Sequence, residues 1–476
     1  MTAPMMLHVE PRRPKRRKWP WRVLWGMLAI VVGTSGYWWW SCETALRERD
    51  ALLAELRAKG EPVFWNETAD KLLAERSPET GAELFLSTLR TLKAASDGTL
   101  LMVPSKLLLV DLDKERFDPK IRPDVQQELK LAEPAIAILE QAVKRSPGLL
   151  TTALKTDDPV SILLPHIQDA RNLSRLLHFG ANDALARGDA KKAYRMVRLA
   201  FLSAEQLAKE PLLIPQLVRL AMRASACDTM TMCLAYAAPS DEDFRAIDEL
   251  LAKVEGGFDL SPAWNAERAM WMTILDDPKL LKGYFTWGTA PMPSMNGFQS
   301  FMRERWCEII ASPIGRPATL RTQSAYLRLT QKMASQLERP DLDREARGKL
   351  LDEFDRDAPL TNMGLNVGDW GLRSSYTVDD ACTKAHRRNI LARLALRLRR
   401  HFDKHGKFPE KLDELCDQTM PKIRTEWFQG KGIVYSHSKS GFRLEVPDAL
   451  LSQKDVERKK QVAKEPSEFA IEVEIK

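Results

Sequence analysis

Two histidines in one regular stretch are the first residues whose spacing could support chemistry. His401 and His405 are four residues apart, so a helix would place both side chains on one face, as in half of a metal site. No glutamate follows His401 as in the HExxH zinc motif, and Gly406 ends the helical pattern directly afterwards. His386 is fifteen residues before His401, too far along the helix to share an ion. We interpret the pair as a solvated helix end, where a histidine cation favours the helix dipole, and predict no metal site.

A literal S-x-x-K sequence occurs at Ser436 to Lys439, which is the spacing of the serine nucleophile and the lysine in β-lactamases. The accompanying K-T-G element is absent and the stretch lies on a predicted hairpin turn, so we interpret the match as chance. The sequence also lacks G-x-S-x-G, P-loop and G-x-G-x-x-G motifs, and its many carboxylates are scattered without an evident pair. We therefore predict no catalytic residues and no cofactor, and favour a protein that is not an enzyme.

Six cysteines are present: Cys42, Cys227, Cys233, Cys307, Cys382 and Cys416. None forms CxxC, so the signatures of zinc ribbons and thioredoxin-like proteins are missing. Cys227 and Cys233 are six residues apart on one predicted helix, which separates them by about 9 Å along its axis, beyond the usual reach of a disulfide. We expect most of the cysteines to be buried as small apolar side chains.

The element that must position all of these residues is an uncharged stretch of twenty residues, Val23 to Cys42. As a helix it is about 30 Å long, the thickness of the hydrocarbon core of a bilayer. Seven lysines and arginines precede it within residues 1–22, and tryptophans or tyrosine lie at both of its ends, as in the aromatic belts of membrane helices. The sequence therefore predicts a single transmembrane helix, with the N-terminus in the cytoplasm and the bulk of the chain exported across the inner membrane.

A cleaved signal peptide and a lipidated cysteine are the two other interpretations of this stretch. A cleaved signal peptide would also have a basic start and an apolar middle, and Gly33, Ser35 and Gly36 offer small residues for cleavage. The bulky run Trp38 to Trp40 is a poor start for a mature chain, and it also disfavours lipidation at Cys42. We expect the stretch to remain as a signal anchor.

The charge of the chain has the same origin. The net charge is +7, and residues 1–22 contribute +6 of it through seven basic residues and one glutamate. The rest of the chain is nearly neutral, so the basic balance indicates membrane topology and not a nucleic-acid partner. We predict a basic cytoplasmic tail at 1–22, the transmembrane helix at 23–42, a helical stalk at 43–60, an α-helical domain at 61–376, and a long helix with a small sheet at 377–476.

Helical periodicity covers most of the exported part. The predicted helices are Asn66 to Arg76, capped by Asn66; one from Ser77-Pro78 to Asp97; Asp124 to Arg145, kinked or split at Pro134; a hairpin turning at Arg187 to Asp189; Ser240 to Val254; one from Ser261; Phe298 to Ser312; Arg316 to Leu337; Leu342 to Asp355; and Thr377 to Phe402. We expect Asp277 to Gly297 to be an apolar loop, and the tryptophans and methionines from Trp264 to Met302 to be core, with a ligand groove as the alternative.

The C-terminal part changes to a period of two, which predicts three short antiparallel strands at Ile433–Tyr435, Phe442–Val446 and Phe469–Ile475. The preceding segment, with Gly406, Pro409 and Leu412, resembles the long helix, hGxyPxxLxxL and strand pattern of a group of uncharacterised bacterial single-span membrane proteins. It also resembles the heads of type II secretion pseudopilins. The chain lacks their Gly-Phe-x-x-x-Glu start, and Trp427 to Gly430 replaces the aspartate-rich calcium loop of some of them.

The function that these observations favour is a membrane-anchored scaffold or protein-interaction module of the cell envelope, with a protein partner of unknown identity. Helical hairpins offer concave faces to such partners. Two alternatives stay open: an envelope hydrolase whose carboxylates lie in a cleft near the region from Trp264 to Met302, and a pseudopilin-like secretion component.

Overall fold

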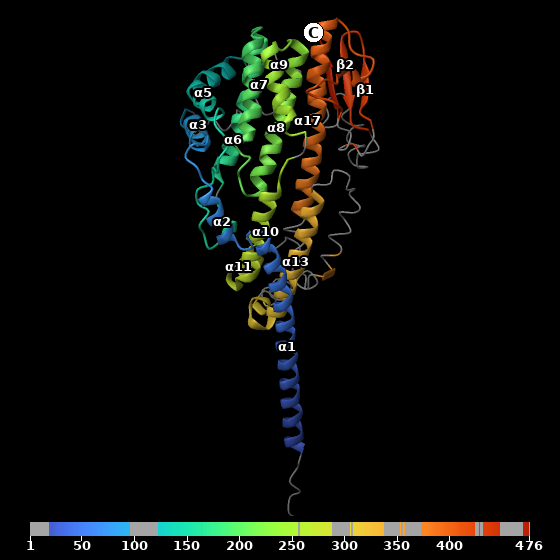
Figure 1. Ribbon diagram of the computed structural model, residues 1–476. Helices are drawn as coiled ribbons and strands as arrows, with labels where there is room; N and C mark the ends of the chain where they lie inside the picture. Colours follow the sequence, from blue (N-terminus) through green and yellow to red (C-terminus); the bar gives the residue numbers. More distant parts are fainter. Residues whose placement is uncertain are drawn as a thin grey trace, which may run out of the picture.

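The computed structural model describes residues 19–95, 122–162, 164–255, 258–287, 308–337, 373–423, 432–447 and 470–475, and the isolated residues 305, 353, 356–357 and 428. This part of the chain is mainly α-helical and has a small antiparallel sheet near the C-terminus, which confirms the predicted fold class at this level (Figure 1).

The helices and strands have the following bounds: α1 (Trp19–Ala58), α2 (Trp65–Ala74), α3 (Ala82–Ala95), α5 (Arg122–Ala142), η1 (Pro159–Ser161), α6 (Pro165–Ala186), α7 (Ala190–Glu205), α8 (Leu213–Tyr236), α9 (Asp241–Ala252), α10 (Ser261–Asp276), α11 (Pro278–Trp287), η2 (Pro313–Gly315), α13 (Arg316–Leu337), α17 (Arg373–His405), η3 (Leu412–Leu415), β1 (Val434–His437), β2 (Gly441–Glu445) and β3 (Ala470–Glu474).

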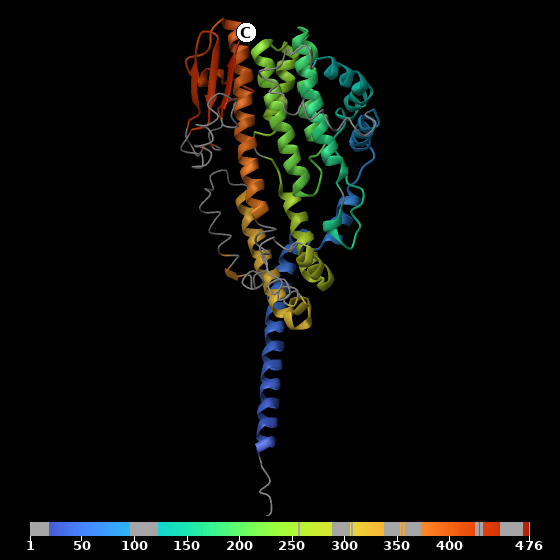
Figure 2. The ribbon, with the colours of Figure 1, turned by 180° about the vertical axis from the view of Figure 1, so that it is seen from behind.

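The body is an elongated bundle from whose base α1 projects (Figures 1 and 2). Helices α6, α7, α8 and α17 lie side by side along it, with α3 and α5 on one flank. The sheet covers the other flank at the end farthest from the projecting part of α1. The C-terminal strands are thus held at the opposite end of the body from the N-terminal helix.

Helix α1 has two halves with opposite surroundings. The side chains at positions 21–40 are exposed, whereas Ser41, Cys42, Leu53 and Leu56 further along the same helix are buried against the body. The segments predicted as a helix at 23–42 and a helical stalk at 43–60 belong to one continuous helix, which ends before Gly60 in the left-handed conformation (φ 72°). Within the described residues we find no helix that combines the length and the apolar character needed to cross a membrane.

The base of the body has a core of its own. Leu53 and Leu56 of α1 pack in one cluster with Trp271 and Met272 of α10 and Leu327 of α13. The predicted helix Arg316 to Leu337 is present with the same bounds. This cluster fixes the direction in which α1 leaves the body.

The helical hairpin of α6 and α7 forms as predicted. It turns at Gly188, whose φ of 72° is costly for residues with a side chain, and Asp189 begins α7 by accepting a hydrogen bond of 2.9 Å from the Lys192 amide. The helix predicted from Ser240 is also present as α9, and the Ser240 hydroxyl caps it by accepting from the Asp243 amide at 3.1 Å. Local sequence signals define both of these helix starts.

The sheet has the order β1-β2-β3, and both pairs are antiparallel, as the period of two predicts. Its buried side chains, such as Leu444 and Val473, belong to the same core as Leu394 and Leu398 of α17. Phe408 follows α17 and stacks on Phe402 with ring centroids 4.7 Å apart. The aromatic residues thus close the joint between the long helix and the sheet.

Two predicted helix starts in the N-terminal part are wrong. Asn66 does not cap α2, which begins one residue earlier after Phe64 without a side-chain cap. The next helix, α3, begins at Ala82 and not at Ser77-Pro78. Residues 78–81 form a turn instead, because the Gly81 amide is drawn to the carbonyl of Ser146 at 2.8 Å.

Further corrections concern the middle of the chain. Pro134 does not split its helix, since α5 is continuous across it. The predicted loop from Asp277 begins with a helix, α11, whose first turn is capped by Asp277 accepting from the Lys279 amide at 2.7 Å. Helix α17 starts four residues before Thr377 and ends three after Phe402. The rest of the loop to Gly297, the helix at 342–355 and most of that at 298–312 lie outside the described residues.

Candidate functional site

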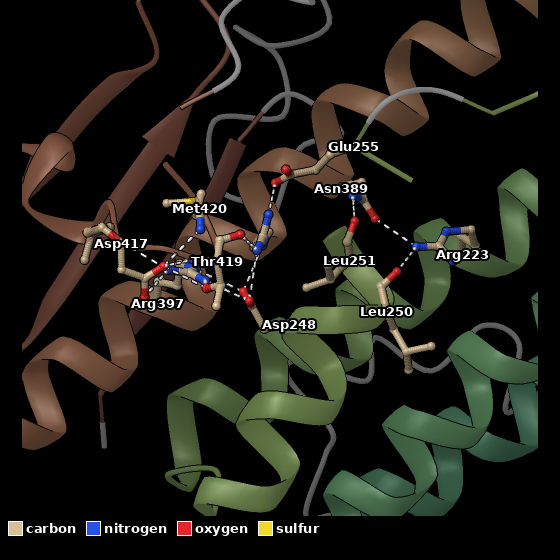
Figure 3. Close-up of polar contacts among 12 residues, drawn as sticks. Arg223, Asp248, Leu250, Leu251, Glu255, Asn389, Arg397, Asp417, Thr419 and Met420 are labelled. Atoms are coloured by element: carbon tan, nitrogen blue, oxygen red, sulfur yellow. Dashed lines mark hydrogen bonds and ion pairs between the residues drawn. The ribbon is translucent and has the colours of Figure 1, made fainter. Parts of the chain in front are cut away.

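Several buried charged side chains come together where α17 crosses α9. Arg393 and Arg397 are one turn apart on α17, and both reach Asp248 of α9 (Figure 3). Arg393 donates to the two oxygens of that carboxylate at 2.8 and 2.9 Å, and Arg397 at 3.0 and 2.7 Å. All three side chains are at most 8% exposed. One carboxylate therefore holds two guanidinium groups by four charge-assisted hydrogen bonds.

The same arginines also hold the segment that leads from α17 to the sheet. Arg393 contacts Glu255 at 2.7 Å and donates to the Thr419 carbonyl at 2.9 Å (Figure 3). Arg397 contacts Asp417 at 3.0 Å and donates to the side-chain hydroxyl of Thr419. This arginine cluster, made of Arg393, Arg397 and Asp248, thereby joins the helical bundle to the C-terminal unit.

The cluster shifts the ionisation of its carboxylates. Burial raises the pKa of Asp248, but the hydrogen bonds from Arg393 and Arg397 outweigh it and hold the pKa below its ordinary value. For Asp417, partial burial opposes the hydrogen bonds from Thr419, the Met420 amide and Arg397, which lower the pKa to about 2. Both groups are thus ionised at neutral pH, and they act as counter-ions and not as proton donors.

A second junction lies further along α17. Asn389 accepts from Arg223 of α8 at 2.9 Å and donates to the Leu251 carbonyl of α9 at 2.8 Å (Figure 3). Arg223 also donates to the Leu250 carbonyl at 3.2 Å and pairs with Glu205 of α7. Helices α7, α8, α9 and α17 therefore meet through buried polar contacts. These contacts fix the positions of the helices relative to one another.

A buried carboxylate outside this junction belongs to Glu210, which follows α7. It accepts from the amides of Leu150 and Thr151 at 2.6 and 3.0 Å, and it lies 3.3 Å from Nε2 of His166. Burial raises the pKa of Glu210, and the contacts with His166 and Thr151 lower it below its ordinary value overall. This group fastens the irregular segment around residue 150 to the bundle.

Glu267 of α10 differs from all of these carboxylates. It accepts a hydrogen bond from the amide of Leu213, at the start of α8, at 3.2 Å. Burial raises its pKa to about 7, and that bond opposes the rise only partly. Tyr284 of α11 and Tyr326 of α13 lie within electrostatic reach of it. A single carboxylic acid can exchange a proton near neutral pH here, but burial and not a second carboxylate causes the shift.

The histidines singled out in the sequence do lie on one face. The ring centroids of His401 and His405 are 4.4 Å apart, and Nδ1 of His401 contacts the Lys407 carbonyl at 3.0 Å. Within the described residues there is no group of three or more histidine, cysteine, aspartate or glutamate side chains that could hold a metal ion.

The other candidate residues from the sequence analysis lie in three different parts of the fold: the sheet, α8 and α10. Ser436 lies on β1 and Lys439 on the hairpin turn after it, both exposed. Cys227 and Cys233 are buried on α8, as expected for small apolar side chains. Trp264 and Trp271 of α10 are buried in two core clusters, which supports the core interpretation for the described part of that region.

Sequence reasoning missed the arginine cluster and Glu267. A signal for the cluster existed, because Arg393 and Arg397 alternate with Ile390, Leu394 and Leu398 on a helix that is apolar on several faces. Charged residues four apart within such a helix indicate buried pairs, but they do not reveal the partner. For Glu267 the sequence offers no comparable signal.

The exposed half of α1 is the most apolar surface of the described chain. Ile30, Val31 and Val32 are each about three-fifths exposed, and Trp39 and Trp40 more than half. Side chains of this kind are normally covered by a partner or by lipid.

Comparisons of the chain with protein-family models, with curated proteins and with solved structures find no match.

Proposed function

We propose that the protein is a membrane-anchored interaction module of the cell envelope, attached through the exposed half of α1. The observation that carries this proposal is the change of environment along one helix: residues 21–40 are exposed, and burial begins at Ser41. Residues 23–40 carry no charge, so the exposed half has no polar face that water would favour. A bilayer is the environment that such a surface fits.

The aromatic residues of this segment favour the same location. Trp25 at one end and Tyr37 to Trp40 at the other reduce its mean hydropathy, yet indole and phenol rings are the side chains that prefer the bilayer interface. The basic residues 12–22 would remain on the cytoplasmic side, so the body would be exported and the chain would be a single-pass protein of the inner membrane.

The interaction part of the proposal is supported by how the body uses its charged residues. Arg223, Arg393 and Arg397 are engaged by buried carboxylates and carbonyls that connect helices. These contacts connect α7, α8, α9 and α17 and engage the three arginines within the helical body. The hydrolase alternative receives less support, because Glu267, with its raised pKa, has burial as the cause and not a carboxylate partner.

Membrane attachment is tested by fractionation of cells that express the full chain, followed by washing of the membranes at alkaline pH. We expect the protein to stay with the lipid. The matched variant replaces residues 23–40 by a charged, alanine-rich helix of equal length, and we expect it to appear in the soluble fraction with an unchanged circular dichroism spectrum of the body. Release of the unmodified chain by the alkaline wash would refute an integral anchor.

The interaction module is tested by mild detergent extraction of the full chain from native membranes, followed by native sizing and mass spectrometry of what co-purifies. A stoichiometric protein partner is expected. A chain that elutes without any partner would contradict this part of the proposal, while leaving the anchor intact.

A further inference from the structure

A turn at the base of the body ends beside the point where α1 leaves it. The indole nitrogen of Trp38 donates to the carbonyl of Ile314 in η2 at 3.2 Å. One turn further along α1, Arg321 of α13 donates to the Ser41 hydroxyl at 2.7 Å. The turn therefore lies at the level where the exposed half of α1 ends and the buried half begins.

The turn presents apolar side chains to the outside. Ile314 is 71% exposed and Ile309 is 42% exposed, whereas Ile310 between them is buried in the core of the base. These two exposed isoleucines, with Trp38, which is 36% exposed, form a surface that we call the apolar tip. It adjoins the exposed half of α1, because Trp38 of that half contacts the Ile314 carbonyl.

The backbone around Ile314 is held rigidly. Ser312 caps η2 by accepting from the Ile314 amide at 3.2 Å, and its hydroxyl donates to the Ile309 carbonyl at 2.6 Å. Gly315 is packed so closely that an added Cβ would lie 2.4 Å from the Ile310 carbonyl oxygen. Ile314 is thus fixed in an exposed position and cannot fold back onto the core without breaking this turn.

The charges beside the tip fit a lipid surface. Arg305 and Lys282 both contact the Glu308 carboxylate, at 2.7 and 3.6 Å, so two basic side chains lie at the surface next to Ile309. Basic side chains next to exposed apolar ones are the combination that anionic headgroups attract. The elements that carry these residues lie at the end of the body from which α1 projects (Figures 1 and 2).

We propose that the apolar tip around Ile314 inserts into the membrane interface next to Trp38, so that the body is held on the bilayer at a second point. This inference rests on the proposed membrane anchor. With contact at α1 and at Ile314, the body stands in one orientation, and the sheet is presented at the end farthest from the lipid.

The test uses the full chain in nanodiscs of phosphatidylcholine and phosphatidylglycerol, with an environment-sensitive NBD label on one introduced cysteine. The three labelled variants are Val32→Cys in the exposed half of α1, Ile314→Cys in the tip and Val434→Cys in β1, all at exposed apolar positions. Cys307 and Cys416 are replaced by serine in every variant, and the parent labelled in the same way gives the background. Circular dichroism confirms that each variant is folded.

Lipids that carry a nitroxide near the headgroup are expected to quench the label at position 314, and lipids with a nitroxide deep in the chain to quench the label at position 32. The label at position 434 should keep its emission with both. Quenching at 32 without quenching at 314 would overturn the second contact and leave the anchor standing. Loss of quenching at 32 would instead refute the anchor. A label at 314 that is shielded from water but not quenched would point to a protein partner at the tip and overturn the inference.

Discussion

Arg393 of α17 and Asp248 of α9 are 145 residues apart in the chain and are joined by two hydrogen bonds, of 2.8 and 2.9 Å. Arg397 binds the same carboxylate from one turn further along α17. Because the Arg393 and Arg397 side chains also hold Glu255, Asp417 and Thr419, removal of one carboxylate disturbs three segments at once.

We expect Asp248→Asn to destabilise the protein strongly. The substitution leaves two buried guanidinium groups without their main counter-ion, and breaking a buried ion pair from one side costs about 3–5 kcal/mol. Urea denaturation followed by circular dichroism measures the free energy of unfolding. Asp241→Asn is the matched control, because Asp241 lies on the same helix and pairs with Arg400 of α17 while 62% exposed.

The exposed pair should contribute about 1 kcal/mol or less. Equal losses in the two variants would show that the buried cluster has no special weight. We expect Asp248→Glu to be more stable than Asp248→Asn but less stable than the unmodified chain. The charge returns in this variant, but the longer side chain disturbs the four hydrogen bonds.

Because of Glu267, we expect the free energy of unfolding to decrease as the pH rises. Its pKa in the folded protein is about 7, against 4.5 for an ordinary glutamate, so the folded state favours the protonated acid. Below pH 4.5 the group is protonated in both states and has no effect. Between pH 4.5 and 7 the unfolded chain ionises first, and the folded state loses up to about 3 kcal/mol relative to it.

The measurement is the free energy of unfolding at a series of pH values for the unmodified chain and for Glu267→Gln. The glutamine cannot ionise, so the decrease between pH 4.5 and 7 should be smaller in the variant by the contribution of this one group. Parallel curves for the two proteins would contradict the assignment. Glu472→Gln, at an exposed position of β3, serves as the control that should follow the unmodified chain.

Local patterns in the sequence predicted part of the fold correctly. The helix α13, the turn at Gly188 and the three strands follow from periodicity and turn residues within a dozen positions, and they were predicted correctly. Local signals failed where a distant segment forms hydrogen bonds with the predicted helix start. At Ser77 the helix was predicted too early, because the hydrogen bond between Gly81 and Ser146 holds a turn there and α3 begins only after it.

The candidate sites depended on such distant partners throughout. Arg393 is recognisable as a basic residue on an apolar helix, but only the packing of α17 on α9 supplies Asp248. In the sequence Glu267 looks like any surface glutamate, and only the structure shows its hydrogen bond with the amide of Leu213 at the start of α8. Three-dimensional neighbours, and not residue types, set the ionisation of these groups.

Two glycines at the base of the body should respond to alanine in opposite directions. At Gly315 a Cβ would lie 2.4 Å from the Ile310 carbonyl oxygen, so Gly315→Ala must displace the backbone and should cost about 1–3 kcal/mol. Gly283 in α11 has open space around the same position. Gly283→Ala should stabilise the helix by about 0.5–1 kcal/mol.

Thermal unfolding of the two variants beside the unmodified chain measures both effects. A Gly315→Ala variant as stable as the parent would mean that the η2 turn adapts easily, and it would weaken the argument that Ile314 is held in place. The opposite signs at two neighbouring parts of the base separate a local clash from a general effect of alanine.

The last prediction concerns orientation in the membrane. Residues 1–22 hold seven basic side chains, whereas the segment that follows Cys42 begins Glu43-Thr44-Ala45-Leu46-Arg47 and is mixed in charge. Positive charge near an apolar helix is retained in the cytoplasm. A phosphatase reporter that is active only outside the cytoplasm should therefore be active when fused after Lys476, and a reporter that fluoresces only in the cytoplasm should be dark there.

Substitution of the basic residues tests whether they cause this orientation. Replacement of Arg12, Arg13, Arg16 and Arg17 by glutamine removes most of the charge difference across the helix and should lower phosphatase activity while the amount of membrane-bound protein stays the same. Unchanged activity would show that the folded body and not the basic residues decides the orientation. Phosphatase inactivity in the unmodified chain would place the body in the cytoplasm, where its partner would then have to be sought.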